Sequence, residues 1–305
     1  MNPILAWHAA GLAGRIASGP LSGIADIAGQ SFLRYAFLAG AAIAAASGLV
    51  GYFMVLRSQV FTGDALSHVA FTGALAALAV GADLLIGLYA TCVLVALAMA
   101  ALGTRGHADD TVIGSVLSWL LGLGALFLTI YTTSSTGANG TSGVNVLFGT
   151  IFGLSATQAI TDSAVTLGVC VAMVVIARPL LFASLDEAVA SARRVPVRAL
   201  GFVYLGLVGV TAAAATQAVG ALLLLGLLAA PAGAAQRLTS RPFRALWLSA
   251  GLAIFSIWSG LLIAYANPRI PPSFGILSVA TGIYLIAILF GGASRRSALA
   301  GPART

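Results

Sequence analysis

Long apolar stretches separated by short polar segments run through most of this 305-residue chain. A helix needs about 20 mostly apolar residues to cross the hydrocarbon core of a bilayer. The pattern predicts nine such helices, with a range of eight to ten, at residues 33–56, 60–81, 83–103, 111–133, 157–182, 199–216, 217–236, 243–266 and 273–292. We therefore predict an all-α polytopic membrane protein.

The connection between the fourth and fifth predicted helices departs from this pattern. Residues 132–143 are polar, and residues 144–155 are apolar but too few to span a bilayer. Such a short apolar run is typical of a re-entrant or interfacial segment. Because non-helical backbone at membrane depth must face protein or a water-filled cavity, we expect 144–155 to line the outer vestibule or pack between helices. The alternative is an outward extension of the fifth helix.

The composition supports a membrane protein and limits its chemistry. Hydrophobic residues make up 60% of the chain and charged residues 8%, against about a quarter charged in soluble domains. All 15 basic residues are arginine. Since a P-loop needs a lysine on the nucleotide phosphates, we expect no ATP hydrolysis by this chain. No nucleic-acid partner is expected of a chain that is mostly membrane spans. Membrane lipid is the expected surrounding.

The arginines predict the orientation. Cytoplasmic loops carry an excess of basic residues. With the N-terminus outside and the C-terminus inside, three arginines lie outside, namely Arg15, Arg34 and Arg269. Twelve lie inside or at the inner boundary, namely Arg57, Arg105, Arg178, Arg193, Arg194, Arg198, Arg237, Arg241, Arg244, Arg295, Arg296 and Arg304.

One membrane domain at 33–292 accounts for most of the chain. Residues 1–32 form an N-terminal segment that is either an interfacial helix or an unstructured terminus, with no signal-peptide pattern. Residues 293–305 read as a basic tail on the cytoplasmic side. No loop is long enough to fold as a second domain.

Asp64 and His68 are the strongest candidates for chemistry, because charges inside a membrane span are costly and are functional by default. Their i, i+4 spacing puts both side chains on one face of a helix. A carboxylate and an imidazole suit a first-row transition metal. If the helix starts near Ser58, His68 lies about 15 Å along it, near the bilayer midplane. A structural Asp–His hydrogen bond and a proton relay remain as alternatives.

The other acidic residues are weaker candidates. Asp162 is placed near the outer end of the fifth helix, where it could draw in cations. For it, as for the others, a solvated or helix-capping role is the leading interpretation. The others include Asp83, Asp109, Asp110, Asp186 and Glu187.

A second informative stretch covers residues 219–241. Its apolar helix is expected to end at Ala229, Ala230 and Pro231, because proline disrupts a continuing helix. Small residues follow before Arg237, and they would let another surface approach closely. This pattern fits a docking segment for a cytoplasmic partner. Its candidate residues are Ala230, Pro231, Ala232, Gly233 and Arg237. An ordinary turn between two helices is the alternative.

Four blocks of the sequence resemble the membrane permeases of ABC importers for zinc, manganese and iron. The most specific block is GYFMVLRSQVFTGDALSHVAFTG at 51–73, and the others lie at 109–119, 184–197 and 219–238. The resemblance extends from about residue 40 to 291. Departures at Val69, Arg194 and the Ala232–Ala235 run leave the identity of the metal open.

The resemblance implies a non-enzymatic permease subunit in the bacterial cytoplasmic (inner) membrane that moves zinc, manganese or iron inward. In this family Asp64 and His68 would contact the metal, and the stretch from Pro231 to Arg237 would dock on a separate ATP-binding subunit. The implied assembly is a permease homodimer with two ATPase subunits and an extracytoplasmic metal-binding protein. The metal is cargo, so no resident cofactor is expected.

Three other functions remain open from the sequence. A permease for a metal chelate such as a siderophore or cobalamin would not need Asp64. An ion- or proton-coupled secondary transporter would work without an ATPase. A membrane scaffold would depend on neither Asp64 nor His68.

Overall fold

The computed structural model describes residues 31–103, 109–134, 149–221, 224–267 and 269–299. Within these residues nine long helices and one short helix form, with no strand. The long helices are α3 (Ser31–Leu56), α4 (Val60–Ala79), α5 (Leu84–Leu102), α6 (Asp110–Ser134), α8 (Ala156–Leu185), α10 (Val197–Val219), α11 (Leu224–Leu238), α12 (Pro242–Ala266) and α13 (Pro272–Leu299). The short helix is α9 (Glu187–Ala192). Most of the predicted segment 1–32 lies outside the described residues.

Seven of the described helices are long and apolar enough to cross a membrane. Of the other two long helices, α11 has 15 residues and α4 carries Asp64 and His68. The prediction of an all-α polytopic membrane protein is confirmed. The helix α13 continues to Leu299, so the predicted basic tail begins inside a helix.

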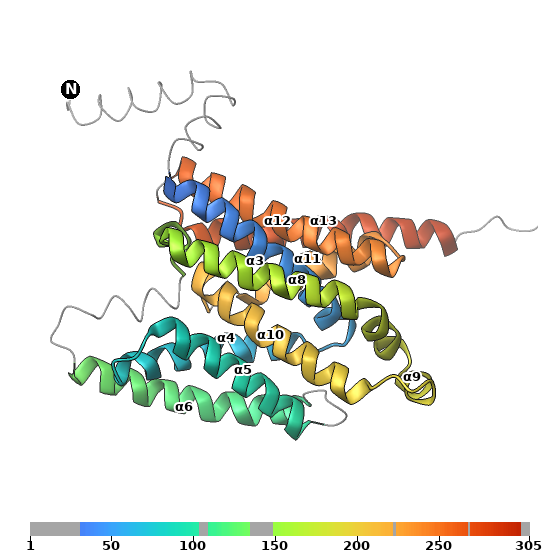
Figure 1. The fold of residues 1–305 in the computed structure, drawn as a ribbon. Coiled ribbons are helices and arrows are strands. Elements are labelled where there is room, and N and C mark those ends of the chain that lie inside the picture. The colour runs from blue at the N-terminus through green and yellow to red at the C-terminus, as the bar shows by residue number, and fades with distance from the viewer. Residues whose placement is uncertain (1–30, 104–108, 135–148, 222–223, 268, 300–305) are drawn as a thin grey trace, which may run out of the picture.

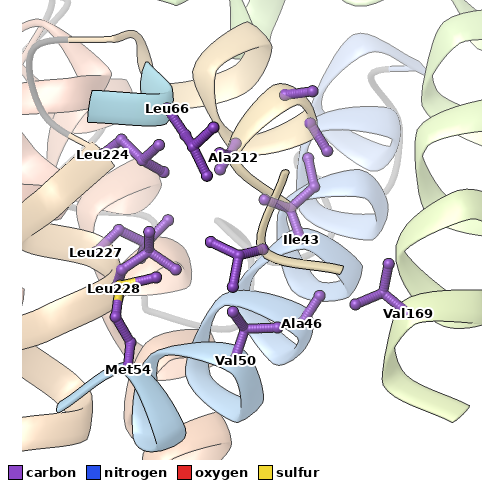
Figure 2. Close-up of a cluster of buried hydrophobic side chains, with 14 of the residues drawn as sticks. Ile43, Ala46, Val50, Met54, Leu66, Val169, Ala212, Leu224, Leu227 and Leu228 are labelled. Carbon is purple, nitrogen blue, oxygen red and sulfur yellow. The ribbon is translucent and has the colours of Figure 1, made fainter. Parts of the chain in front are cut away.

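Helix α3 lies at the centre of the bundle. It packs against α12, α8 and α11, whereas α4 packs against α5 and α6. Figure 1 shows α12 and α13 on one side of α3, and α4, α5 and α6 on the other. In the core, Met54 of α3 lies beside Leu228 of α11, and Leu66 of α4 reaches the same cluster (Figure 2).

Two glycines let neighbouring helices touch the backbone of α3. A Cβ on Gly48 would lie 2.6 Å from the Cα atom of Ala250 in α12, and one on Gly51 would collide with the carbonyl oxygen of Leu228 in α11. The Ser249 hydroxyl also donates a hydrogen bond to the Gly48 carbonyl over 2.7 Å. Small residues allow this close helix packing in membranes.

The prediction that the apolar helix ends at Pro231 is wrong, because α11 runs through Pro231 to Leu238. Proline removes one backbone hydrogen bond, but membrane helices tolerate this where neighbouring groups compensate. Pro231 is buried in the bundle. The boundary before α11 also differs. Helix α10 ends at Val219, and Gly220 follows with φ 100° and ψ 153°, a conformation that is almost exclusive to glycine.

The apolar segment before α8 packs between helices, as far as the described residues show it. Residues 144–148 lie outside them. The Thr150 amide donates to the Gln217 carbonyl over 3.1 Å, and Ile151 is buried in a short 3₁₀ turn, η2 (Ile151–Gly153), beside α3 and α10. Helix α8 begins only after Ser155, which caps it. The alternative of a helical extension is therefore wrong for residues 149–155.

One end of the bundle, called here the arginine-rich end, gathers several connections between helices. It includes the α3–α4 turn, α9 with the residues that follow it, and the α11–α12 turn. Figure 1 shows α9 at this end, on the right. Its arginines include Arg57, Arg193, Arg194, Arg198, Arg237 and Arg241. Arg34 and Arg269 lie in the described residues of the opposite end.

Candidate functional site

One face of α4 stays partly exposed while the rest of the helix packs against neighbours. Phe61, Asp64, His68 and Phe71 form this face, called here the α4 stripe. Their i, i+3, i+7 and i+10 spacing follows one side of a helix. The intervening positions are mostly buried against α5, α6, α10 and α11. The sequence prediction that Asp64 and His68 share one face is confirmed.

Both side chains of the pair are half-buried, one helical turn apart. Asp64 is four residues from the first residue of α4 and His68 eight, which places them about 6 and 12 Å along the helix axis. Among the described residues, no hydrogen bond joins the two side chains. The Ser67 hydroxyl binds the carbonyl oxygen of Asp64 over 2.7 Å, not its carboxylate. The pair can therefore present an oxygen and a nitrogen to a ligand.

The chemistry of these two groups fits a borderline divalent metal better than calcium or magnesium, because an imidazole nitrogen is included. Within the described residues no group of three or more His, Cys, Asp or Glu could hold a metal ion. Two protein ligands make a weak site by themselves. Such a site suits an ion that stops briefly rather than a resident cofactor.

Most residues of the predicted docking segment, Ala230–Gly233, pack against other helices of this chain. Ala230 is half-buried, and the side chains of Pro231 and Ala232 are buried. A Cβ on Gly233 would lie 2.9 Å from the ring of Tyr284 in α13. The small residues thus bring α11 against its own neighbours, and docking of a partner on this segment stays a prediction.

The exposed part of this region lies further along, at residues called here the docking face: Arg237, Leu238, Ser240 and Arg241. Leu238 is 47% exposed. The Arg237 guanidinium stacks 5.4 Å from the ring centroid of Tyr284 and donates to its hydroxyl over 3.3 Å. A cation over an aromatic ring is attracted by the ring's electrons. This contact fixes the end of α11 on α13.

Helix α11 also touches the α4 stripe's own helix. The Leu228 side chain would lie 3.1 Å from a Cβ on Gly63, the residue before Asp64. Arg237 is nine residues from Leu228, about 14 Å along the helix. One continuous helix thus joins the docking face to the start of α4.

Arg57 occupies the turn just before α4. Its guanidinium lies 5.3 Å from the ring centroid of Tyr204, and the Tyr204 hydroxyl donates to the Val50 carbonyl over 3.1 Å. Burial lowers the pKa of Arg57 from its ordinary value, while Tyr204 and Glu187 of α9 oppose the shift. Since arginine remains charged in proteins, Arg57 is a fixed positive charge between α9 and the start of α4.

Asp162 is a residue whose setting the sequence reasoning missed. It is 2% exposed, so the expected solvated or capping role is wrong. The Tyr89 hydroxyl of α5 donates to its Oδ1 atom over 3.0 Å, and its Oδ2 atom is buried with no hydrogen-bond partner among the described residues. The signal was present in the sequence: Asp162 continues the spacing of buried residues Ala159, Thr166, Val169 and Met173 along α8.

The capping role expected of other acids is confirmed for Asp83 and Asp186. The Asp83 carboxylate accepts from the Leu85 and Ile86 amides at 2.8 and 3.3 Å. Asp186 accepts from the Val189 amide at 2.9 Å and begins α9. Asp110 is the first residue of α6, and a capping role for it stays a prediction.

Bundle and site together define a polytopic permease with a paired Asp and His on a partly exposed helix face. The family model for the ABC 3 transport family matches residues 29–291, and the chain belongs to that family. It is 28% identical over 264 residues to the manganese transport system membrane protein MntC of Halalkalibacterium halodurans, covering 85% of this chain and 87% of the relative. It is 30% identical to MntD, a manganese transport system membrane protein of Bacillus subtilis, covering 87% and 94%.

A solved structure has the same fold. The structure of PsaBC from Streptococcus pneumoniae in complex with Fab matches with a TM-score of 0.75 and 25% identity, covering 87% of this chain and 93% of the matched chain. The predicted resemblance to metal-importer permeases is confirmed at the level of the family.

Proposed function

We propose that this permease moves a divalent transition metal into the cytoplasm, and that Asp64 and His68 contact the metal on its way. The observation that carries the proposal is the placement of both side chains on the α4 stripe, half-buried and with metal-binding atoms available. Relatives of this chain carry manganese in their names. Manganese is therefore the first cargo to test, followed by zinc and iron.

The weakness of a two-ligand site supports a homodimer. If the α4 stripe faces a second copy across a two-fold axis, two Asp64–His68 pairs supply four ligands to one path. Closed two-fold symmetry is the commonest arrangement of homo-oligomers. An extracytoplasmic metal-binding protein would deliver the ion to the outer end of this path.

A separate ATPase subunit would drive transport from the docking face. No lysine occurs in the 305 residues, so a P-loop lysine must come from another chain. Arg237, Leu238 and Arg241 offer charge and apolar surface at the arginine-rich end. A push on this face would move α11, whose Leu228 contacts Gly63 beside Asp64.

The arginine-rich end is proposed to face the cytoplasm, with the N-terminus outside. The support is the positive-inside bias, since Arg57, Arg193, Arg194 and Arg198 gather there and Arg34 and Arg269 lie at the opposite end. The ATP-binding subunit would then meet the docking face on the side where ATP is present.

The test is metal uptake by cells that lack their own high-affinity importers. The chain is expressed with its ATPase and binding protein, as wild type, Asp64→Asn and His68→Gln, with manganese, zinc and iron supplied separately. Asp110→Asn is the matched control, because Asp110 is an exposed acid at the first turn of α6. We expect uptake of one metal that needs the ATPase, is lost in the two stripe variants and is kept in the control.

Three outcomes would contradict parts of this proposal. Uptake that survives both stripe substitutions at equal protein levels would make the pair structural. Uptake without the ATPase would indicate a secondary transporter. Uptake of a metal chelate, with no uptake of the free ion, would replace the proposed cargo.

A further inference from the structure

A groove opens between α8 and α12 on the outside of the bundle. Its volume is about 220 Å³, and it is lined by Val174, Ala177, Arg178, Phe243, Leu246 and Trp247. Helices α8 and α12 both pack on α3, and Figure 1 shows α3 between them. The groove is therefore formed where two helices flank a third.

Arg178 is the unusual residue of this groove. It is an exposed arginine on a membrane-spanning helix, where an uncompensated charge is costly. Among the described residues, no acidic side chain pairs with it. It lies seven residues before Leu185, the end of α8, about 10 Å along the axis. Its guanidinium is thus placed close to the boundary between hydrocarbon and headgroups.

The opposite wall supplies aromatic side chains at the same level. Phe243 and Trp247 are 46% and 58% exposed, and both lie in the first two turns of α12. Tryptophan is enriched at the membrane–water interface, where its ring spans the apolar and polar layers. Arg244 is three residues before Trp247, so it lies on the same side of α12. The groove joins positive charge to exposed apolar surface.

We propose that the α8–α12 groove binds one anionic phospholipid, with Arg178 holding the phosphate and Trp247 and Phe243 covering the start of an acyl chain. A free anion would satisfy Arg178 but leave the aromatic surface uncovered. A second protein surface would need a counter-charge for Arg178 at membrane depth. A phospholipid supplies both groups at the depth where they are needed, and basic pockets between membrane helices are known to bind anionic headgroups.

The site is independent of the metal path. It lies at the arginine-rich end, which the proposed orientation assigns to the cytoplasmic leaflet, but its binding needs neither metal nor ATPase. A failure of the lipid proposal would therefore leave the transport proposal untouched, and a failure of metal uptake would leave the lipid proposal untouched.

The experiment measures lipid binding to the purified full chain. Phosphatidylglycerol, phosphatidylcholine and inorganic phosphate are titrated separately, and binding is read from thermal stability and from native mass spectrometry of retained lipid. The variants are Arg178→Gln, Arg178→Lys and the control Arg193→Gln, an exposed arginine of the same end that does not line the groove. We expect phosphatidylglycerol to bind wild type and the control equally.

Arg178→Gln should weaken phosphatidylglycerol binding about fivefold, the equivalent of about 1 kcal/mol for one basic side chain at an anionic membrane surface. Arg178→Lys should recover part of that loss, because lysine binds phosphate as a point charge. Equal stabilisation by phosphatidylcholine, or an equal loss in Arg193→Gln, would overturn the proposal. If inorganic phosphate alone stabilises the chain as much as phosphatidylglycerol, the groove is an anion site and the lipid proposal fails. If the purified chain forms a lipid-free dimer through the α8–α12 groove, the groove is a contact between two copies and the proposal fails.

Discussion

The backbone contact between α3 and α11 can be tested by adding a single methyl group. In Gly51→Ala the new Cβ would collide with the carbonyl oxygen of Leu228, and the Leu228 Cα would lie 3.3 Å away. Because the obstacle is backbone, no side-chain rotation can relieve the collision. The variant must move α11 away from α3 or lose stability.

Two matched variants isolate the size of this effect. Overpacking a well-packed interior costs about 1–3 kcal/mol, whereas glycine to alanine inside a helix gains about 0.5–1 kcal/mol. Gly251→Ala in α12 should gain the same helix stability without overpacking, because no atom lies within 4 Å of the new Cβ. Gly63→Ala meets the Met54 sulfur at 2.9 Å, but a flexible methionine can yield. We expect stability to fall in the order Gly251→Ala, Gly63→Ala, Gly51→Ala.

Thermal unfolding in one detergent, followed by a thiol-reactive dye, measures this order. Cys92 is buried and Cys170 half-buried, so the dye reports loss of packing. Midpoints are compared at a single heating rate, because unfolding of such proteins is often irreversible. If Gly51→Ala and Gly251→Ala unfold at the same midpoint temperature, α3 and α11 are not in backbone contact and the reasoning fails.

Three further predictions follow from other contacts. Tyr89→Phe should lower the free energy of unfolding by about 1–3 kcal/mol, because it removes the hydrogen bond that the Tyr89 hydroxyl donates to the buried Asp162 carboxylate. In a double-mutant cycle measured by thermal unfolding, Tyr89→Phe should have no such effect in the Asp162→Ala background. Gly220→Ala should cost about 1–3 kcal/mol through its backbone conformation, whereas Gly282→Ala, with open space at its Cβ, should not lower the melting temperature. Tyr284→Ala should reduce ATPase binding in a pull-down, and Tyr284→Phe should keep most of it because the ring remains; equal binding by both variants and wild type would contradict this.

Hydropathy alone located the helices well because membrane spans need long apolar runs whatever their neighbours are. The predicted helix at 83–103 became α5 at Leu84–Leu102, and the one at 243–266 became α12 at Pro242–Ala266. The pairing of Asp64 with His68 was equally predictable, since i, i+4 spacing fixes a shared face. Features that depend on a single segment, such as the helix positions and the shared face of Asp64 and His68, could therefore be predicted from the sequence.

Features that depend on tertiary contacts were not accessible in the same way. Pro231 was expected to end a helix from its local chemistry, but burial among neighbouring helices keeps α11 continuous through it. Asp162 was expected to be solvated from its charge, but Tyr89 lies 73 residues away in the chain and supplies the hydrogen bond that accompanies its burial. In both cases a distant residue reverses the local preference.

The small residues of α11 show the same effect with a functional consequence. In the sequence they suggested a surface open to a partner, whereas in the fold Ala232 is buried and Gly233 lies against Tyr284. The exposed residues of α11 lie at its end, and the Arg237–Tyr284 contact ties that end to α13. Leu228 of the same helix touches Gly63, so under the proposed function a partner at the docking face would act on the Asp64–His68 pair through one intervening contact.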